Sequence, residues 1–144
     1  QINVYGDGRQ IRDWLYVDDH ADALIKILYH GSIFNTYNIG GNYEKKNIDV
    51  VKSICEIMED LVPNKPHNIN RYLELVKFVE DRPGHDFRYA IDSTKIEKDL
   101  KWSPRESFET GIKKTITWFL KNDKWWKNII SGKYKLNRIG KIKN

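Results

Sequence analysis

The five-residue turn Asp81-Arg82-Pro83-Gly84-His85 combines the side chains in this sequence best suited to holding an anionic ligand. Pro83 fixes its own backbone φ, and Gly84 can adopt the positive φ that a tight turn often needs. Arg82 offers a planar fork of donors that matches a phosphate, and the imidazole of His85 adds a donor beside it. The turn therefore predicts a rigid loop suited to a diphosphate. A purely structural turn, held by ion pairs within the loop, is the alternative.

Two more polar residues could take part in the same binding site. Arg12 lies in a segment of strand-like alternation, and Asn38 lies just before Gly40-Gly41. Arg12 could equally form a surface ion pair with Asp13, which would contribute little. Asn38 could instead bond a neighbouring backbone group. The pattern alone leaves both roles open for each residue.

The sequence contains no recognisable catalytic or metal-binding pattern. Gly6-Asp7-Gly8 is followed by Ile11, so the Gly-x-Gly-x-x-Gly dinucleotide motif is absent. None of the eight tyrosines has a lysine four positions later, and the four histidines lack metal-ligand spacing. We therefore expect no catalytic residue and no metal site in this chain, which is equipped to bind an anionic ligand and not to transform it alone.

The composition is that of a soluble domain. The 144 residues are 40% hydrophobic and 31% charged, which suits one domain with its own core. No segment approaches the roughly 20 apolar residues of a membrane span. The lone Cys55 excludes an internal disulfide and is expected to be a small buried hydrophobe. Together these features favour the cytoplasm.

Positive charge is concentrated at the C-terminal end. Residues 121–144 contain seven lysines and Arg138 against Asp123 alone. Such a tail can bind nucleic acid or an anionic membrane. No nucleic-acid-binding motif accompanies it, so a solvated basic extension is the favoured interpretation.

Alternating strand and helix patterns predict an α/β fold. Gly6-Asp7-Gly8 predicts a hairpin between the first two strands, and Asp18 or Asp19 is expected to cap the first helix, as Asn47 is the second. The strands are short and scattered, so we do not expect them to form one self-sufficient sheet. Strands are expected at 2–5, 10–17, 36–40, 75–80 and 87–91, and helices at 19–30, 48–61, 94–100, 107–120 and 125–130.

The chain begins at Gln1, and its single methionine is Met58. Residues 1–20 hold no apolar run long enough for a secretory signal. We therefore expect the chain to be the C-terminal part of a longer protein.

Four blocks of this sequence, in order and at matching spacing, resemble the C-terminal half of the dTDP-glucose 4,6-dehydratases, which are extended short-chain dehydrogenases/reductases. The resemblance implies that the apolar side chains of Leu24, Ile25, Leu28 and Ile39 face the missing part. The resemblance covers roughly residues 1–120. The stretch from Asp81 to Asp92 is more specific to one enzyme than the other blocks are. It favours this enzyme over related decarboxylases, GDP-mannose dehydratases and epimerases. The blocks are Tyr5–Gly8 with Gln10–His20, Thr36–Gly41, Asp81–Asp92, and Trp102–Pro104 with Phe108–Ile112.

This resemblance implies a fold, an activity and a set of ligand contacts. The fold is a C-terminal substrate-binding lobe plus the last elements of an NAD-binding Rossmann-type domain. The activity is NAD-dependent conversion of dTDP-glucose to dTDP-4-keto-6-deoxyglucose by a homodimer, with NAD and the catalytic groups held by the missing N-terminal half. Residues 1–120 would form the nucleotide-sugar-binding part and 121–144 a basic extension. The implied substrate contacts are Tyr5, Arg12, Asn38, Asp81, Arg82, Pro83, Gly84 and His85.

Two kinds of alternative remain open at this point. The chain could belong to another nucleotide-sugar epimerase or dehydratase of the same family. It could also be a non-catalytic module that binds a nucleotide or nucleic acid through its basic tail. Past about residue 133 the sequence departs from the family, and Tyr134 is not assigned to the nucleotide-contacting tyrosine found there.

Overall fold

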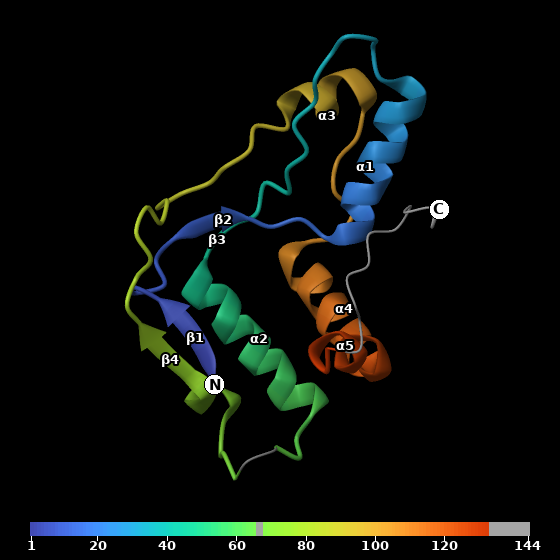
Figure 1. Ribbon diagram of the computed structural model, residues 1–144. Coiled ribbons are helices and arrows are strands. Elements are labelled where there is room, and N and C mark those ends of the chain that lie inside the picture. Colours follow the sequence, from blue (N-terminus) through green and yellow to red (C-terminus); the bar gives the residue numbers. More distant parts are fainter. Residues whose placement is uncertain (66–67, 133–144) are drawn as a thin grey trace, which may run out of the picture.

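The computed structural model describes residues 1–65 and 68–132 as an α/β arrangement of short strands and five α-helices (Figure 1). The predicted basic tail thus lies largely outside the described residues, as does Tyr134. The strands are β1 (Ile2–Tyr5), β2 (Ile11–Asp13), β3 (Glu44–Lys46) and β4 (Val76–Val79), and a 3₁₀ helix covers Tyr72–Leu75. The helices are α1 (Val17–His30), α2 (Asn47–Leu61), α3 (Thr94–Leu100), α4 (Phe108–Lys121) and α5 (Asp123–Ile130).

The described strands form two separate pairs, as expected for strands that cannot make one sheet. β1 runs parallel to β4, with Ile2 opposite Val76. β2 runs antiparallel to β3, with Ile11 opposite Lys46. The predicted hairpin between the first two strands is therefore wrong. Gly6 and Gly8 both have positive φ, and the turn they form carries the chain from one pair into the other.

Two predicted strands are replaced by irregular backbone. Residues 36–40 form no strand, and just after them the carboxylate of Asp13 accepts hydrogen bonds from the backbone N–H groups of Gly41 and Tyr43, each at 2.8 Å. This side chain provides the partner that a neighbouring strand would have supplied. Residues 87–91 contribute only one parallel bridge, between Ile11 and Arg88.

The five predicted helices are confirmed, with different caps at two of them. Tyr16 and Lys46 occupy the N-cap positions of α1 and α2, so neither Asp18, Asp19 nor Asn47 caps its helix. Asp19 is buried in the first turn of α1 and accepts a 3.0 Å hydrogen bond from the backbone N–H of Glu106. Its carboxylate thus joins α1 to the segment before α4. Ser107 is the N-cap of α4, and its side chain accepts a hydrogen bond from the backbone N–H of Thr110.

The described core has its centre where α1 and α3 pack side by side (Figure 1). Its fully buried members are Ala23, Ile96, Leu100 and Trp102. Cys55 is buried on α2, as predicted, and burial raises the pKa of its thiol. In the described part of the chain, no helix is both long and apolar enough to cross a membrane.

Helix α1 has a second apolar face, and no other described element covers it. Leu24, Ile25 and Leu28 are each more than half exposed, as expected, whereas Ile39 packs against the core. The predicted stripe is thus the outer face of α1, and Ala23 with Ile27 forms the inner one. Adjacent apolar side chains of this kind mark an interaction surface.

We expect Leu28→Lys to lower the fluorescence of a dye that binds exposed apolar surface, since Leu28 is 78% exposed. The free energy of unfolding should change by no more than about 0.5 kcal/mol, as for other surface substitutions. Urea denaturation followed by circular dichroism measures this change. Ile27→Lys, one position away on the inner face, is the matched control and should destabilise the chain strongly. Equal effects of the two substitutions would contradict the assignment of the two faces.

Candidate functional site

A groove of about 390 Å³ lies between strand β1, helix α2 and the turn at residues 81–85. It brings together three of the predicted site residues, Tyr5, Arg82 and His85, from segments far apart in the sequence. Apolar side chains from β1 and α2 form much of its lining. The groove is lined by Asn3, Val4, Tyr5, Trp14, Asn47, Val50, Val51, Ile54, Arg82 and His85.

Hydrogen bonds within the turn hold the segment that carries Arg82 and His85. Gly84 adopts a φ of 68° in open space, so it is the backbone conformation that favours glycine there. Asp81 holds the turn through its Oδ1 atom, which lies 2.6 Å from Nδ1 of His85 and accepts from the backbone N–H of Arg82 at 2.9 Å. The bond from His85 is the main cause that lowers the pKa of Asp81. Pro83 and Gly84 form the exposed tip of the turn.

Arg82 and Arg12 keep their positive charges available. Neither makes an ion pair within residues 1–65 and 68–132, whereas Arg88 and Arg105 pair with Glu44 and Asp22. Arg82 is exposed at the groove. The Arg12–Asp13 ion pair considered from the sequence is absent from the described structure.

Arg12 lies beside the segment that follows the turn. Its Nη1 donates to the backbone carbonyl of Ile11 at 2.6 Å, and its Nη2 donates to that of Asp86 at 3.0 Å. The guanidinium also lies 4.7 Å from the centre of the Tyr89 ring. Arg12 is thus held on the turn's C-terminal side by neutral groups, without lining the groove itself.

Asn38 lies apart from the groove. It lines a separate pocket of about 440 Å³ with His20, Tyr37 and Asp92, among others. The groove is lined by two other asparagines, Asn3 and Asn47, of which Asn47 is the first residue of α2. Asn47 is polar and precedes an amphipathic helix, which made it a predicted cap. In the structure Lys46 occupies the cap position of α2, which leaves the side chain of Asn47 free for another role.

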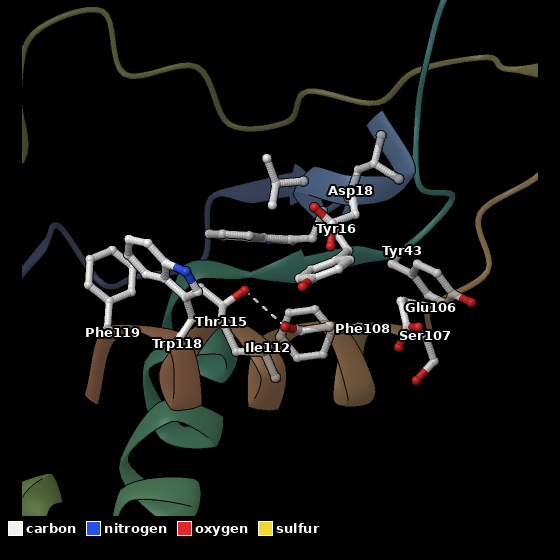
Figure 2. A pocket seen from close by; sticks show the side chains of 14 residues that line it. Tyr16, Asp18, Tyr43, Glu106, Ser107, Phe108, Ile112, Thr115, Trp118 and Phe119 are labelled. Carbon is white, nitrogen blue, oxygen red and sulfur yellow. Dashed lines mark hydrogen bonds between the residues drawn. The ribbon is translucent and has the colours of Figure 1, made fainter. Parts of the chain in front are cut away.

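The largest pocket, about 600 Å³, lies between residues 14–18 and helix α4 (Figure 2). Tyr16 faces the side chains of Phe108, Ile112 and Trp118, which project from α4. Its charged lining groups are Asp18 and Glu106, so its potential disfavours a diphosphate. The pocket is mainly apolar, contains none of the predicted site residues, and is a weaker candidate than the groove.

The described residues do not fit the role of an NAD site. Gly6 and Gly8 connect two strands, whereas a dinucleotide motif connects a strand to a helix N-terminus. A Cβ atom at Gly8 would lie 2.8 Å from Val4 and 2.9 Å from Ile48, so this glycine serves close packing against α2. Among the described residues, no group of three potential ligands could hold a metal ion.

Comparison with known proteins gives consistent results. The family model described as GDP-mannose 4,6 dehydratase matches residues 1–115. The chain is 56% identical over 139 residues to a dTDP-glucose 4,6-dehydratase of Neisseria meningitidis, and 54% identical over 141 residues to one of Escherichia coli. These matches cover 96% and 98% of this chain but 39% of each relative.

A solved structure shows the same relation. The dTDP-glucose 4,6-dehydratase of Bacillus anthracis, in complex with NAD, superimposes with a TM-score of 0.75 at 38% identity, over 88% of this chain and 37% of that one. The chain therefore spans less than two fifths of the length of these relatives and has part of their extended short-chain dehydrogenase/reductase fold. It belongs to the GDP-mannose 4,6-dehydratase family and, within that family, is similar to the dTDP-glucose 4,6-dehydratases.

Proposed function

We propose that the chain is the nucleotide-sugar-binding part of a dTDP-glucose 4,6-dehydratase. The whole enzyme would convert dTDP-glucose to dTDP-4-keto-6-deoxyglucose with NAD, as a cytoplasmic homodimer. The observation that carries this proposal is the groove itself. An arginine without an ion-pair partner lies there beside His85, Asn47 and Tyr5, in a chain 54–56% identical to such dehydratases.

Each groove residue has a role that its chemistry suits. Arg82 would bind the diphosphate through charge-assisted hydrogen bonds, with Arg12 adding positive charge from the far side of the turn. Tyr5, which is half exposed, offers a ring against which the base can pack. Asn47 offers both an amide donor and an acceptor to the nucleotide. Asn38 lines another pocket, and its contact with the ligand stays a prediction from the resemblance.

Catalysis belongs to the part of the enzyme that this chain does not contain. NAD, bound there, would accept a hydride from the sugar and return it. This chain contributes binding and orientation, because it has neither the Tyr-x-x-x-Lys pair nor the dinucleotide motif. Its unpaired arginines would hold the diphosphate and so present the sugar to the catalytic groups.

We expect the 144-residue chain to bind dTDP but to give no 4-keto product from dTDP-glucose and NAD. Isothermal titration calorimetry measures the binding, and absorbance of the alkaline-treated 4-keto sugar measures turnover. Glucose 1-phosphate, which lacks the nucleotide, is the control ligand and should bind much more weakly. Turnover by the chain alone would overturn the assignment of catalysis to the remaining length.

Salt dependence separates this proposal from binding of nucleic acid through the basic tail. Contacts from many lysines to a polyanion weaken steeply with salt, because each contact releases counterions. Binding of dTDP through two arginines should weaken less. Tight, strongly salt-dependent binding of an oligonucleotide, together with no binding of dTDP, would favour the nucleic-acid alternative.

A further inference from the structure

Gln10 contacts both walls of the groove without lining it. Its side-chain Nε2 donates to Oδ2 of Asp81 at 3.0 Å, which reaches the turn at 81–85. Its backbone carbonyl accepts a hydrogen bond from the backbone N–H of Asn47 at 2.9 Å. This second bond joins Gln10 to the first residue of α2. Gln10 itself is only 6% exposed, whereas the Asp81 side chain that it contacts is 41% exposed.

Three groups of the protein contact the carboxylate of Asp81, whose side chain is 41% exposed. One oxygen contacts His85 and the backbone N–H of Arg82, and the other accepts from Gln10. Gly6 lies against the same group, since a Cβ atom there would be 2.8 Å from Oδ2 of Asp81. Asp81 is therefore held on three sides and acts on the ligand through its neighbours, in contrast to the direct contact that the resemblance implied.

The orientation of His85 follows from this arrangement. A carboxylate accepts hydrogen bonds, so the Nδ1 atom of His85 carries a proton and donates to Asp81. The ring is 6% exposed and lines the groove. The nitrogen left for a ligand is Nε2. If the Asp81 side chain could rotate, its hydrogen bond would no longer fix the orientation of the His85 ring.

The side chain of Gln10 also contains an atom that lowers the stability of the fold. Its Oε1 is buried and has no hydrogen-bond partner among the described residues. Rotating the amide would not help, because Oε1 would then face the carboxylate oxygen that Nε2 now contacts. A buried unpaired acceptor destabilises the folded state, whereas an apolar group of similar shape does not. The unpaired Oε1 therefore offsets part of the stabilisation that Nε2 provides by donating to Asp81.

We propose that Gln10 is a positioning residue for the nucleotide groove. It fixes the rotamer of Asp81 and, through Asp81, the ring of His85, while its backbone holds the start of α2. This inference rests on the proposed function for its ligand, a nucleoside diphosphate. The orientation of His85 is independent of that function.

The test compares Gln10→Met with the unsubstituted 144-residue chain, using dTDP as the probe. Binding should weaken about threefold to tenfold, because Gln10 acts on the ligand only through Asp81 and His85. The Tm should change little, because loss of the bond to Asp81 is offset by removal of the buried unpaired Oε1. In ¹H–¹⁵N NMR spectra, neutral His85 should be the Nδ1–H tautomer in the unsubstituted chain, and a mixture of the Nδ1–H and Nε2–H tautomers in the variant. Ser93→Ala, a buried polar site away from the groove, is the control and should change neither binding nor the His85 signals.

Unchanged dTDP affinity and an unchanged His85 tautomer in a folded Gln10→Met variant would overturn the proposal. A His85 proton on Nε2 in the unsubstituted chain would do so even if the variant failed to fold. If the unsubstituted chain bound no dTDP, the proposed function of the chain would fail. The tautomer comparison would then still decide whether Gln10 positions His85.

Discussion

Replacement of Arg82 by alanine is expected to weaken binding of dTDP roughly tenfold to a hundredfold, the loss typical of a charge-assisted hydrogen bond. Arg82 is exposed at the groove and makes no ion pair in the described part of the chain. A diphosphate can therefore interact with the full positive charge of Arg82 without displacing a carboxylate. Lysine at this position should restore binding only in part, because it supplies the charge without the planar fork of donors.

The matched control for Arg82→Ala is Arg105→Ala. Arg105 is also an exposed arginine, but it pairs with Asp22 at 3.1 Å and does not line the groove. Titration calorimetry at constant ionic strength compares the two variants. Equal loss of affinity in both would mean that the chain attracts dTDP by general charge alone, and the groove would then not be the site.

Replacement of Trp102 by alanine is expected to cost about 3–5 kcal/mol, as for other large aromatic side chains removed from a core. Trp102 is 2% exposed and packs with Ala23, Ile96 and Leu100. A domain of this size has only about 5–15 kcal/mol of stability in total, so the variant should unfold near room temperature. Far-ultraviolet circular dichroism in urea measures the change without depending on tryptophan fluorescence.

Trp125→Ala is the control for this substitution. Trp125 is 54% exposed and contacts the aromatic rings of Trp118 and Phe119. Its removal should leave the core around α1 and α3 intact and cost far less. A larger loss of stability from Trp125→Ala than from Trp102→Ala would place the main core at α4 and α5.

Helical periodicity predicted the secondary structure better than strand patterns did. The spacing of apolar residues located all five helices, because that spacing is a local property of each segment. Strand pairing depends on partners far away in the sequence. The segment at 36–40 has a strand-like composition, yet the carboxylate of Asp13 holds the residues that follow it in place of a ladder.

The site was predicted only in part, for a similar reason. The turn at 81–85 could be recognised because its five residues are consecutive and their chemistry is distinctive. Asn47 could not be recognised, since its role depends on where α2 begins relative to β1. Asn38 was the more conspicuous asparagine, but the chain carries it into another pocket. Both residues are asparagines, so their positions in the fold, not their residue type, determine which of them lines the groove.

The two walls of the groove also have a consequence for folding kinetics. Gln10 and Asp81 are separated by 71 positions, and the parallel pairing of β1 with β4 joins equally distant segments. Closing a loop of this length costs conformational entropy before any contact compensates for it. The hydrogen bonds within helices α1 and α4 are local, whereas the groove depends on these long-range contacts. Its binding surface is therefore complete only when the N-terminal strand and the segment around residue 80 have come together.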